Sequence, residues 1–284
     1  MRRARSMEPS GARTALFNVM DRAVRKAARS LVHDFGEVEQ LQVSVKGPGD
    51  FVSAADHQSE RILMSELRRA RPDFGFLMEE GGEEKGKDSR HRWVIDPLDG
   101  TTNFLHGIPQ FCISVALERD NEPIAGVVYD PLRDEFFYAE RGVGAFMNDR
   151  RLRVSARAQL GDAVIGTGIP FRSRGDHPRY LRMLEAVMGN TAGVRRMGAA
   201  ALDLAYVAAG RFDGFFELGL SRWDIAAGIV LVREAGGFVS EIDGGNNPLA
   251  SGSVLATNQR LQGPLGRLLR EANREQSVKP RGEN

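Results

Sequence analysis

Two aspartates three residues apart, Asp96 and Asp99, are the residues of this chain whose spacing most clearly suggests chemistry. They follow the apolar run 93–95, which has the pattern of a short strand. Pro97 has no backbone N–H and restricts the residue before it, so the strand is expected to end at Asp96. Two carboxylates then share one turn, where like charges repel each other unless a cation lies between them.

Two interpretations of this turn stay open from the residues alone. In the first, Asp96 starts an Asx-turn and Asp99 caps a helix that begins at Gly100. In the second, both carboxylates bind a hard cation such as Mg2+, which prefers oxygen ligands. The next residues favour the second, because the N–H groups of Gly100 and Thr101 would form an anion site at a helix N-terminus. Metal-binding carboxylates beside a phosphate site indicate phosphoryl chemistry.

The composition is that of an ordinary globular protein. The chain has 284 residues, of which 42% are hydrophobic and 27% charged, enough for a large core. Lys plus Arg number 39 against 38 Asp plus Glu, so the net charge does not indicate nucleic acid or a membrane as the main partner. The single cysteine, Cys112, lies in an apolar run and is expected to be a buried thiol, which leaves no disulfide framework within the chain.

The ends of the chain show no membrane or export signal. Apolar runs stay far below the roughly 20 residues that a bilayer span needs. Residues 1–11 contain three arginines without a following apolar segment and are expected to form a flexible leader. Residues 12–273 are expected to form a single domain and residues 274–284 a flexible polar tail. With this use of cysteine, the expected location is the cytoplasm.

Helical and strand patterns alternate along the chain without internal repeats. Apolar residues recur at helical spacing in segments 14–35, 53–70, 180–188, 199–209, 224–235 and 259–273. Strand patterns occupy 41–46, 74–78, 111–118, 124–129, 135–140, 145–147, 163–167, 212–218, 237–241 and 254–257. The strands between 111 and 140 are expected to pair antiparallel, and the charged, glycine-rich stretch 81–88 to form a solvated loop. This order predicts an α/β (α+β) fold of layered sheets and helices.

Four motifs stand in a particular order along the chain: FVSAAD at 51–56, the acidic pair 79–80, DPLDGTTNF at 96–104 and WDIAAG at 223–228. In this order they resemble the inositol monophosphatase family, part of the lithium-sensitive, magnesium-dependent sugar phosphatases. The resemblance spans about residues 15–269. It implies a layered αβαβα sandwich and a homodimer.

The resemblance also implies the metal ligands. In similar proteins the first metal binds the carboxylates of Glu79 and Asp96 and the backbone carbonyl of Leu98. The second metal binds Asp96, Asp99 and Asp224, so Asp96 bridges the two. Oxygen ligands suit Mg2+, of which two or three are expected per active site. Two metals can stabilise both the entering and the leaving oxygen of an in-line displacement.

Asp224 and Asp56 also have simpler interpretations. Asp224 begins an apolar helical pattern and could be its N-cap, and Asp56 could be a first-turn acid of the helix that starts at Ser53. In the resemblance, Asp56 instead pairs with the hydroxyl of Thr101, and the pair helps to polarise the attacking water. The residues expected to act in catalysis are Thr101, Asp56 and Glu79.

The resemblance places the alcohol of the substrate beside two further segments. Glu217, at the end of the strand pattern 212–218, matches the residue that receives a substrate hydroxyl in relatives. Gly198, Ala199 and Ala200 match the loop and helix start on the inositol side, and Ala199 stands where some relatives have threonine. The residues expected to contact the substrate are Glu79, Leu98, Asp99, Gly100, Thr101, Gly198, Ala199, Ala200, Glu217 and Asp224.

The sequence therefore predicts Mg-dependent hydrolysis of a phosphate monoester, foremost myo-inositol monophosphate, with inhibition by lithium. One alternative is another sugar phosphatase or bisphosphatase, of the fructose-1,6-bisphosphatase or nucleotide 3'-phosphatase type. Another is a binding protein of transcription complexes with incidental phosphatase activity. Basic pairs such as Arg150-Arg151 and Arg195-Arg196 permit contact with nucleic acid or a transcription factor, although a solvated surface has the same pattern.

Overall fold

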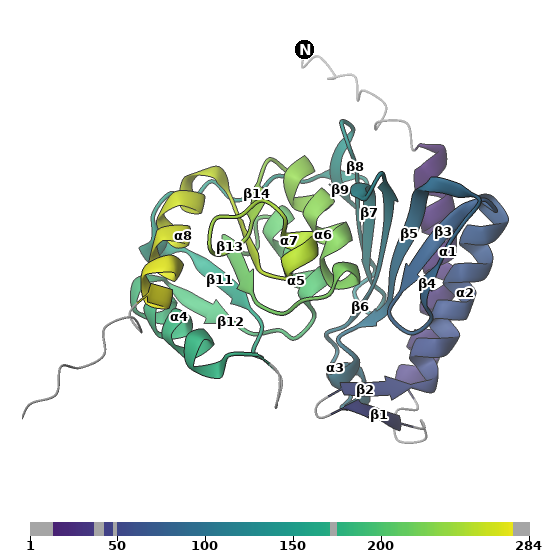
Figure 1. The fold of residues 1–284 in the computed structure, drawn as a ribbon, viewed down its shortest axis with the longest axis horizontal. Coiled ribbons are helices and arrows are strands. Elements are labelled where there is room, and N and C mark those ends of the chain that lie inside the picture. Colours follow the sequence, from purple (N-terminus) through teal and green to yellow (C-terminus); the bar gives the residue numbers. More distant parts are fainter. Residues whose placement is uncertain (1–13, 37–42, 48–49, 171–174, 275–284) are drawn as a thin grey trace, which may run out of the picture.

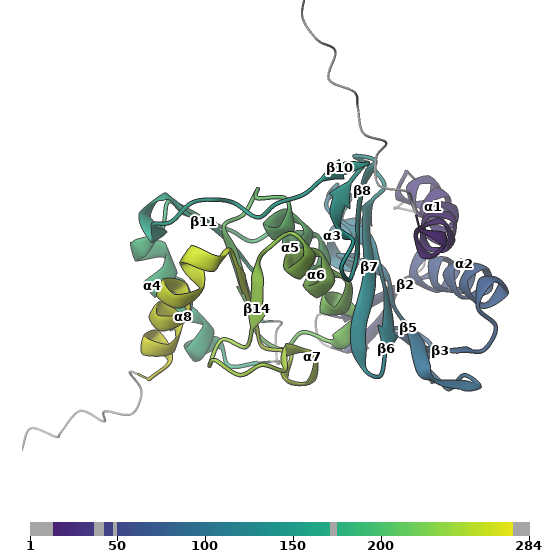
Figure 2. The ribbon, with the colours of Figure 1, turned by 90° about the horizontal axis from the view of Figure 1, so that it is seen from above.

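Helix and sheet layers alternate through the molecule, in the order αβαβα. The computed structural model describes residues 14–36, 43–47, 50–170 and 175–274, and side chains only outside 43–53; the expected leader 1–11 and the tail after 274 lie outside the described residues. Figures 1 and 2 show the larger sheet between two helix pairs, and the smaller sheet beyond the inner pair. The helices of these layers are α1 (Ala15–Phe35), α2 (Ala54–Ala70), α5 (Ala200–Ala208), α6 (Arg222–Glu234), α4 (His177–Asn190) and α8 (Gln259–Arg274). The expected sandwich is confirmed.

The larger sheet has eight strands in the described part of the chain, in the order β10-β9-β8-β7-β6-β5-β3-β4. Strands β3 and β5 are parallel, whereas β5 to β10 pair antiparallel, so the antiparallel strands predicted between 111 and 140 are confirmed. The strands are β3 (Phe74–Met78), β4 (Gly82–Glu84), β5 (Asp88–Asp99), β6 (Cys112–Arg119), β7 (Glu122–Asp130), β8 (Glu135–Glu140), β9 (Gly144–Met147) and β10 (Arg150–Arg151).

The smaller sheet has the order β12-β11-β13-β15-β14. Its strands are β11 (Val164–Thr167), β12 (Gly193–Arg195), β13 (Gly214–Glu217), β14 (Phe238–Ser240) and β15 (Val254–Thr257). β11 is parallel to β12 and β13, and β15 pairs antiparallel with β13 and β14. The shorter elements are β1 (Val43–Gly47), β2 (Asp50–Ser53), α3 (Thr101–Leu105), α7 (Pro248–Ser251) and a 3-10 helix at Leu160–Asp162.

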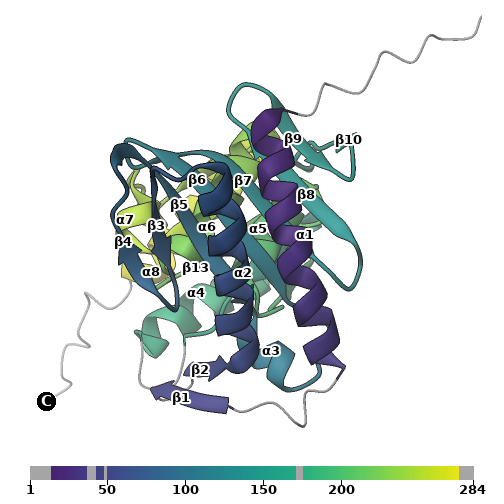
Figure 3. The same cartoon turned by 90° about the vertical axis from the view of Figure 1, so that its right-hand side faces the viewer.

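Apolar cores fill the spaces between the layers. Figure 3 shows α1 and α2 lying across the outer face of the larger sheet. The apolar face predicted for 14–35 is the one that α1 buries there, with Met20 and Leu31 fully buried in one apolar cluster with the sheet residue Trp93. Burying a side chain of this size stabilises the fold by about 1.5–3 kcal/mol. None of the described helices is long and apolar enough to cross a bilayer.

Small residues allow α6 to pack closely between the larger sheet and α5. A Cβ added at Gly126 in β7 would lie 2.7 Å from the Cα of Ala227 in α6. One added at Gly228 would lie 2.6 Å from the Cβ of Leu204 in α5. Larger side chains would therefore force the layers apart. This packing holds α6 against β5, β6, β7 and β8 of the larger sheet.

Two local predictions were wrong. Strand β5 does not end at Asp96 but continues to Asp99; its ladder with β6 is irregular between these residues and resumes with Asp99 opposite Cys112. Proline is tolerated at such an irregularity because no ladder hydrogen bond is needed from it. The stretch 81–88 is not wholly a loop, because Gly82–Glu84 forms the exposed edge strand β4 on β3.

Candidate active site

The site is built on the turn at the end of β5. The N–H of Leu98 donates to Asp96 Oδ1 at 3.0 Å, which is the Asx-turn of the simpler interpretation. The Thr101 hydroxyl donates to the carbonyl oxygen of Leu98, also at 3.0 Å. From α2, Ser59 Oγ donates to the carbonyl oxygen of Pro97 at 2.9 Å. The turn is therefore held from both sides, by its own residues and by a neighbouring helix.

Asp99 does not cap the helix that follows it. The N-cap of α3 is Gly100, whose φ of +96° is favourable for glycine, and no side chain caps it. Asp99 Oδ2 instead accepts the N–H of Ala201, in the first turn of α5, at 2.7 Å. The buried thiol of Cys112 lies 3.7 Å from the same oxygen, and burial raises the pKa of this thiol, so the expected unreactive cysteine is supported. Asp99 thus joins β5 of the larger sheet to the N-terminus of α5.

Asp224 is not an N-cap either. The N-cap of α6 is Ser221, and its backbone N–H donates to Asp224 Oδ2 at 2.7 Å. This is the third-position acid of a capping box, so the helix begins earlier than the apolar pattern suggested. Arg222 fixes the same helix start, because its Nε donates to the buried carboxylate of Glu118 at 2.6 Å.

The four acids implied as metal ligands are near enough to influence one another. Glu79 follows β3, and its N–H donates to the carbonyl oxygen of Ile95, next to Asp96 in the chain. Burial raises the pKa of Asp96 well above its usual value, and the charges of Glu79, Asp99 and Asp224 raise it further. Burial raises the pKa of Asp99 to about 6, opposed by the Ala201 N–H, and burial together with the charge of Asp99 raises that of Asp224. The fold therefore concentrates negative charge in this place.

The donor chemistry of this cluster fits Mg2+. In Asp96 and Asp224 one oxygen accepts a backbone N–H, and the other has no hydrogen bond within the described ranges. Oxygens of this kind are the ligands that Mg2+ prefers. Among the described residues, however, no three Asp, Glu, His or Cys side chains already surround a metal position. Carboxylates repel one another when no cation lies between them, so an open arrangement is the expected one.

Asp56 lies in α2, the helix that contacts the turn, and Thr101 follows that turn in the chain. Asp56 is only 1% exposed, and its expected position in the first turn of the helix, here α2, is confirmed. Ser59, three residues further along α2, is the residue that holds Pro97. The hydrogen bond of the Thr101 hydroxyl goes to Leu98, and its pairing with Asp56 stays a prediction.

The loop before α5, which the resemblance places on the alcohol side of the substrate, lies against α3. A Cβ added at Gly100 would lie 3.3 Å from that of Ala199. Asn103 Nδ2 donates to the carbonyl oxygens of Gln110 at 2.8 Å and Met197 at 2.9 Å, which joins the two segments. Sequence reasoning gave Asn103 no role, although it stands within the motif at 96–104. Gly198, with a φ of +85°, and Ala200 follow Met197 at the start of α5.

Glu217 ends β13 and faces the same cluster. Burial raises the pKa of Glu217 to about 8, the charge of Asp99 adds to the effect, and that of Arg196 opposes it. Asp203 in α5, which sequence reasoning missed, is 1% exposed, and its Oδ1 has no hydrogen-bond partner in the described part of the chain. Burial, then the charges of Glu217 and Asp99, raise the pKa of Asp203. An acid within an otherwise apolar helical pattern was the available signal.

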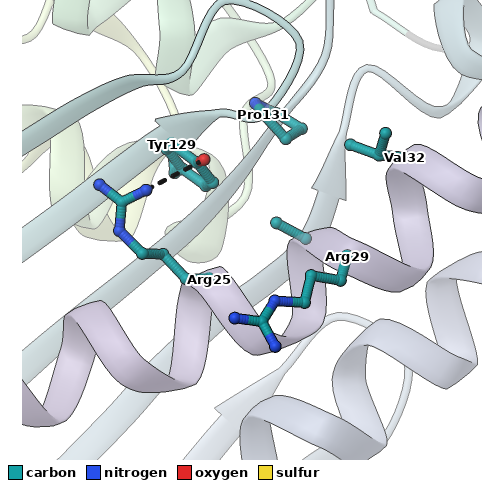
Figure 4. A pocket seen from close by; sticks show the side chains of 6 residues that line it. Arg25, Arg29, Val32, Tyr129 and Pro131 are labelled. Atoms are coloured by element: carbon teal, nitrogen blue, oxygen red, sulfur yellow. Dashed lines mark hydrogen bonds between the residues drawn. The ribbon is translucent and has the colours of Figure 1, made fainter.

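A separate surface hollow lies between α1 and the end of β7. Figure 4 shows Arg25 and Arg29 on the helix side, with Arg25 donating to the hydroxyl of Tyr129 at 3.3 Å. This hollow shares no residue with the acidic cluster, and Arg25 also forms ion pairs with Asp21 and Asp134. It adds nothing to the chemistry of the site.

Comparisons with known proteins find relatives over most of the chain. The family model of the inositol monophosphatase family matches residues 13–275. An inositol-1-monophosphatase of Mesorhizobium japonicum is 62% identical over 254 residues, which cover 89% of this chain and 96% of that protein. Nus factor SuhB of Pseudomonas aeruginosa is 45% identical over 249 residues, covering 86% of this chain and 92% of that protein.

The likeness extends to solved structures. The crystal structure of extragenic suppressor protein suhB from Bartonella henselae matches with a TM-score of 0.89 and 56% sequence identity, over 91% of this chain and 99% of that one. The layered fold, the cluster of acids at the end of β5 and these similarities lead to one conclusion. The chain belongs to the inositol monophosphatase family.

Proposed function

We propose that this protein hydrolyses the phosphate monoester of a small polyol, foremost myo-inositol monophosphate, with two or three Mg2+ per active site. As a member of its family it is a phosphoric monoester hydrolase. The observation that carries the proposal is the gathering of Glu79, Asp96, Asp99 and Asp224, from three distant segments, into one mutually repelling cluster. Such a cluster favours cations, and beside it lie the N–H groups of the turn that ends β5.

The metal ligands we propose are those of the family. Glu79, Asp96 and the carbonyl oxygen of Leu98 would hold one Mg2+, and Asp96, Asp99 and Asp224 a second. The Leu98 oxygen already accepts the Thr101 hydroxyl, and its second lone pair stays available. When bound, the ions supply positive charge to the phosphoryl oxygens and lower the pKa of the attacking water.

The chain's own groups would orient the water and the phosphate. Because the Thr101 hydroxyl donates its proton to Leu98, its oxygen is left as an acceptor for a water proton. A threonine is a weak base alone, so in the reaction its hydroxyl would turn from Leu98 and donate its proton to the buried carboxylate of Asp56, while its oxygen accepts the proton of the water. The N–H groups of Gly100 and Thr101 would hold the phosphate, and the Ala201 N–H keeps Asp99 in place.

The leaving alcohol would lie between α3 and the smaller sheet. Glu217 would receive one of its hydroxyls, and Gly198, Ala199 and Ala200 would line the same side. Support comes from the position of Ala199 beside Gly100 and from the electrostatic influence of Asp99 on Glu217.

A substrate panel tests the choice of alcohol. Phosphate release is measured from myo-inositol 1-phosphate, fructose 1,6-bisphosphate and a nucleoside 3'-phosphate, each with saturating Mg2+. We expect the highest kcat/KM for the inositol ester. A kcat/KM at least tenfold higher for the bisphosphate or the nucleotide would contradict that assignment and favour the alternative phosphatase.

A second role in transcription complexes has one specific support, the 45% identity to a protein named Nus factor SuhB. A variant without turnover, Asp96→Asn, separates the two roles. If binding is the main role, this variant restores the phenotype of a deletion strain as well as the wild type does. If catalysis is the main role, it fails to do so.

Three further properties are part of the proposal. Inhibition by lithium and a homodimer follow from the family, and a cytoplasmic location follows from the use of cysteine. Lithium inhibition is measured with the phosphate-release assay, and the dimer by light scattering at micromolar concentration. We expect lithium to lower turnover at millimolar concentration and the mass to be twice that of the 31.3 kDa chain.

A further inference from the structure

Glu217 lies against the backbone of Gly168. Strands β11 and β13 are parallel neighbours, with Thr167 opposite Phe216, so Gly168 and Glu217 are the next residues of the two strands (Figure 1). A Cβ added at Gly168 would overlap the carboxylate carbon and both carboxylate oxygens of Glu217. The overlap is with the end of a flexible side chain, so an added methyl group would displace the carboxylate rather than the strand.

The backbone at Gly168 does not itself require glycine. Its φ lies outside the left-handed range, unlike that of Gly100 or Gly198. A Cβ is therefore excluded at this position by the Glu217 carboxylate and not by the chain conformation. A glycine with no conformational need, directly under an acid of the active site, suggests a role in placing that acid.

The other surroundings of Glu217 leave its carboxylate dependent on this contact. The positive charge of Arg196 opposes the rise in the pKa of Glu217, and the negative charge of Asp99 adds to that rise. The charge of Glu217 in turn raises the pKa of Asp203. The carboxylate of Asp203 is buried, and its Oδ1 makes no hydrogen bond in the described residues. No hydrogen bond from the described chain holds the Glu217 carboxylate, so packing on Gly168 sets how far it reaches.

We propose that Gly168 is a positioning residue for the alcohol side of the substrate: its missing side chain lets the Glu217 carboxylate lie back against β11 and meet a hydroxyl of the polyol. This rests on the proposed function, in which Glu217 receives that hydroxyl. A methyl group at 168 would push the carboxylate toward the substrate and spoil this contact, while the metal ligands and the phosphate-binding turn stay in place.

The test compares two substrates of Gly168→Ala. We expect KM for myo-inositol 1-phosphate to rise at least about tenfold, as for loss of one hydrogen bond to a charged group. For p-nitrophenyl phosphate, whose leaving group has no polyol hydroxyl, kcat/KM should change less than twofold. The matched control is Gly189→Ala in α4, where an added Cβ meets nothing within 4 Å, and both substrates should be unaffected.

A double-mutant cycle separates positioning from damage to the fold. In the Glu217→Ala background, adding Gly168→Ala should change KM for the inositol ester less than twofold, because the displaced carboxylate is gone. Independent, multiplying effects of the two changes would overturn the proposal, as would an equal loss with both substrates in Gly168→Ala. If the wild type itself fails to release phosphate from the inositol ester, the proposed function fails; if it succeeds and Gly168→Ala matches it, only the role of Gly168 fails.

Discussion

Asp96, Asp99 and Asp224 each accept a backbone N–H at 2.7–3.0 Å, from Leu98, Ala201 and Ser221 respectively. These bonds fix the carboxylates, and their close negative charges oppose one another. Because an amide can still accept the same N–H, replacing one acid with its amide should remove charge while keeping the local fold.

Asp96→Asn should lower kcat/KM for the inositol ester at least a hundredfold, because the ligand proposed to bridge both metals loses its charge. Circular dichroism and thermal unfolding should show a folded protein. The matched control is Asp120→Asn at an exposed turn with φ +54°, a conformation that asparagine adopts readily, and it should keep full activity. An Asp96→Asn variant with more than a tenth of wild-type turnover would contradict a bridging role.

Thr101→Val should lower kcat about a hundredfold or more, since valine has the same shape without the hydroxyl that bonds to Leu98. Thr101→Ser, which keeps the hydroxyl, should retain at least a tenth of the activity. Steady-state kinetics with the inositol ester compare the two. Equal activity in the two variants would show that the hydroxyl takes no part in the reaction.

At this scale the sequence predicted the acids themselves but not all of their contacts. Asp99 and Asp224 looked like N-caps because each stands near a helix start, yet one bonds to a residue 102 positions away and the other lies inside its helix. Gly168 and Asp203 carried no motif, and their importance depends on Glu217, which only the fold brings beside them. The apolar helical pattern around Asp203 marks it as unusual, but such contacts are tertiary, so no local pattern could show which group it meets.

The elements around the site depend on close backbone packing. Helix α6 carries Asp224 and lies on β7, where Gly126 faces Ala227, so the position of a proposed metal ligand depends on a helix–sheet distance.

Gly126→Ala should lower the free energy of unfolding by about 1–3 kcal/mol, because the new methyl group meets backbone atoms of α6 that cannot move alone. Urea unfolding measures the change. Gly161→Ala serves as control, since an added Cβ there meets nothing within 4 Å, and its effect should be below about 1 kcal/mol. An unchanged unfolding midpoint for Gly126→Ala would mean that the two layers can separate without cost.

Long periodic segments were the most predictable elements. The patterns at 14–35 and 259–273 became α1 and α8 within one residue, because many apolar positions agree on one helical face. The short strands β4, β10 and β12 were missed. They contain two or three residues, and in β4 glycine and glutamate have low strand propensity, so pairing with a neighbour decides their conformation.

The whole molecule brings the two sheets together at the site. Asp96 and Asp99 come from the larger sheet, Glu217 from the smaller one, and Asp224 from the helix layer between them. Because buried acids come from all these layers, the free energy of unfolding is expected to depend on pH.

Without metal, the protein should become more stable as pH falls from about 8.5 to about 5. The pKa of Asp99 is raised to about 6 and that of Glu217 to about 8. As pH falls, each carboxylate therefore binds its proton at a higher pH in the folded state than in the unfolded state. Stability from such groups is present at low pH and lost as pH rises through the folded pKa. Melting temperatures in EDTA measure this, and Mg2+ should raise the melting temperature more at pH 8 than at pH 5.5, because protons compete with the metal. A metal-free melting temperature that falls on acidification across this window would contradict the account.

The most direct test of the central claim is phosphate release from myo-inositol 1-phosphate by the metal-free protein as Mg2+ is added back. The account predicts no turnover above background in EDTA, turnover that rises and saturates with Mg2+, and turnover at least a hundredfold lower in Asp96→Asn at every Mg2+ concentration. Turnover that persists in EDTA, or Mg2+-dependent turnover of wild-type size in Asp96→Asn, would contradict a phosphatase built on this cluster of acids.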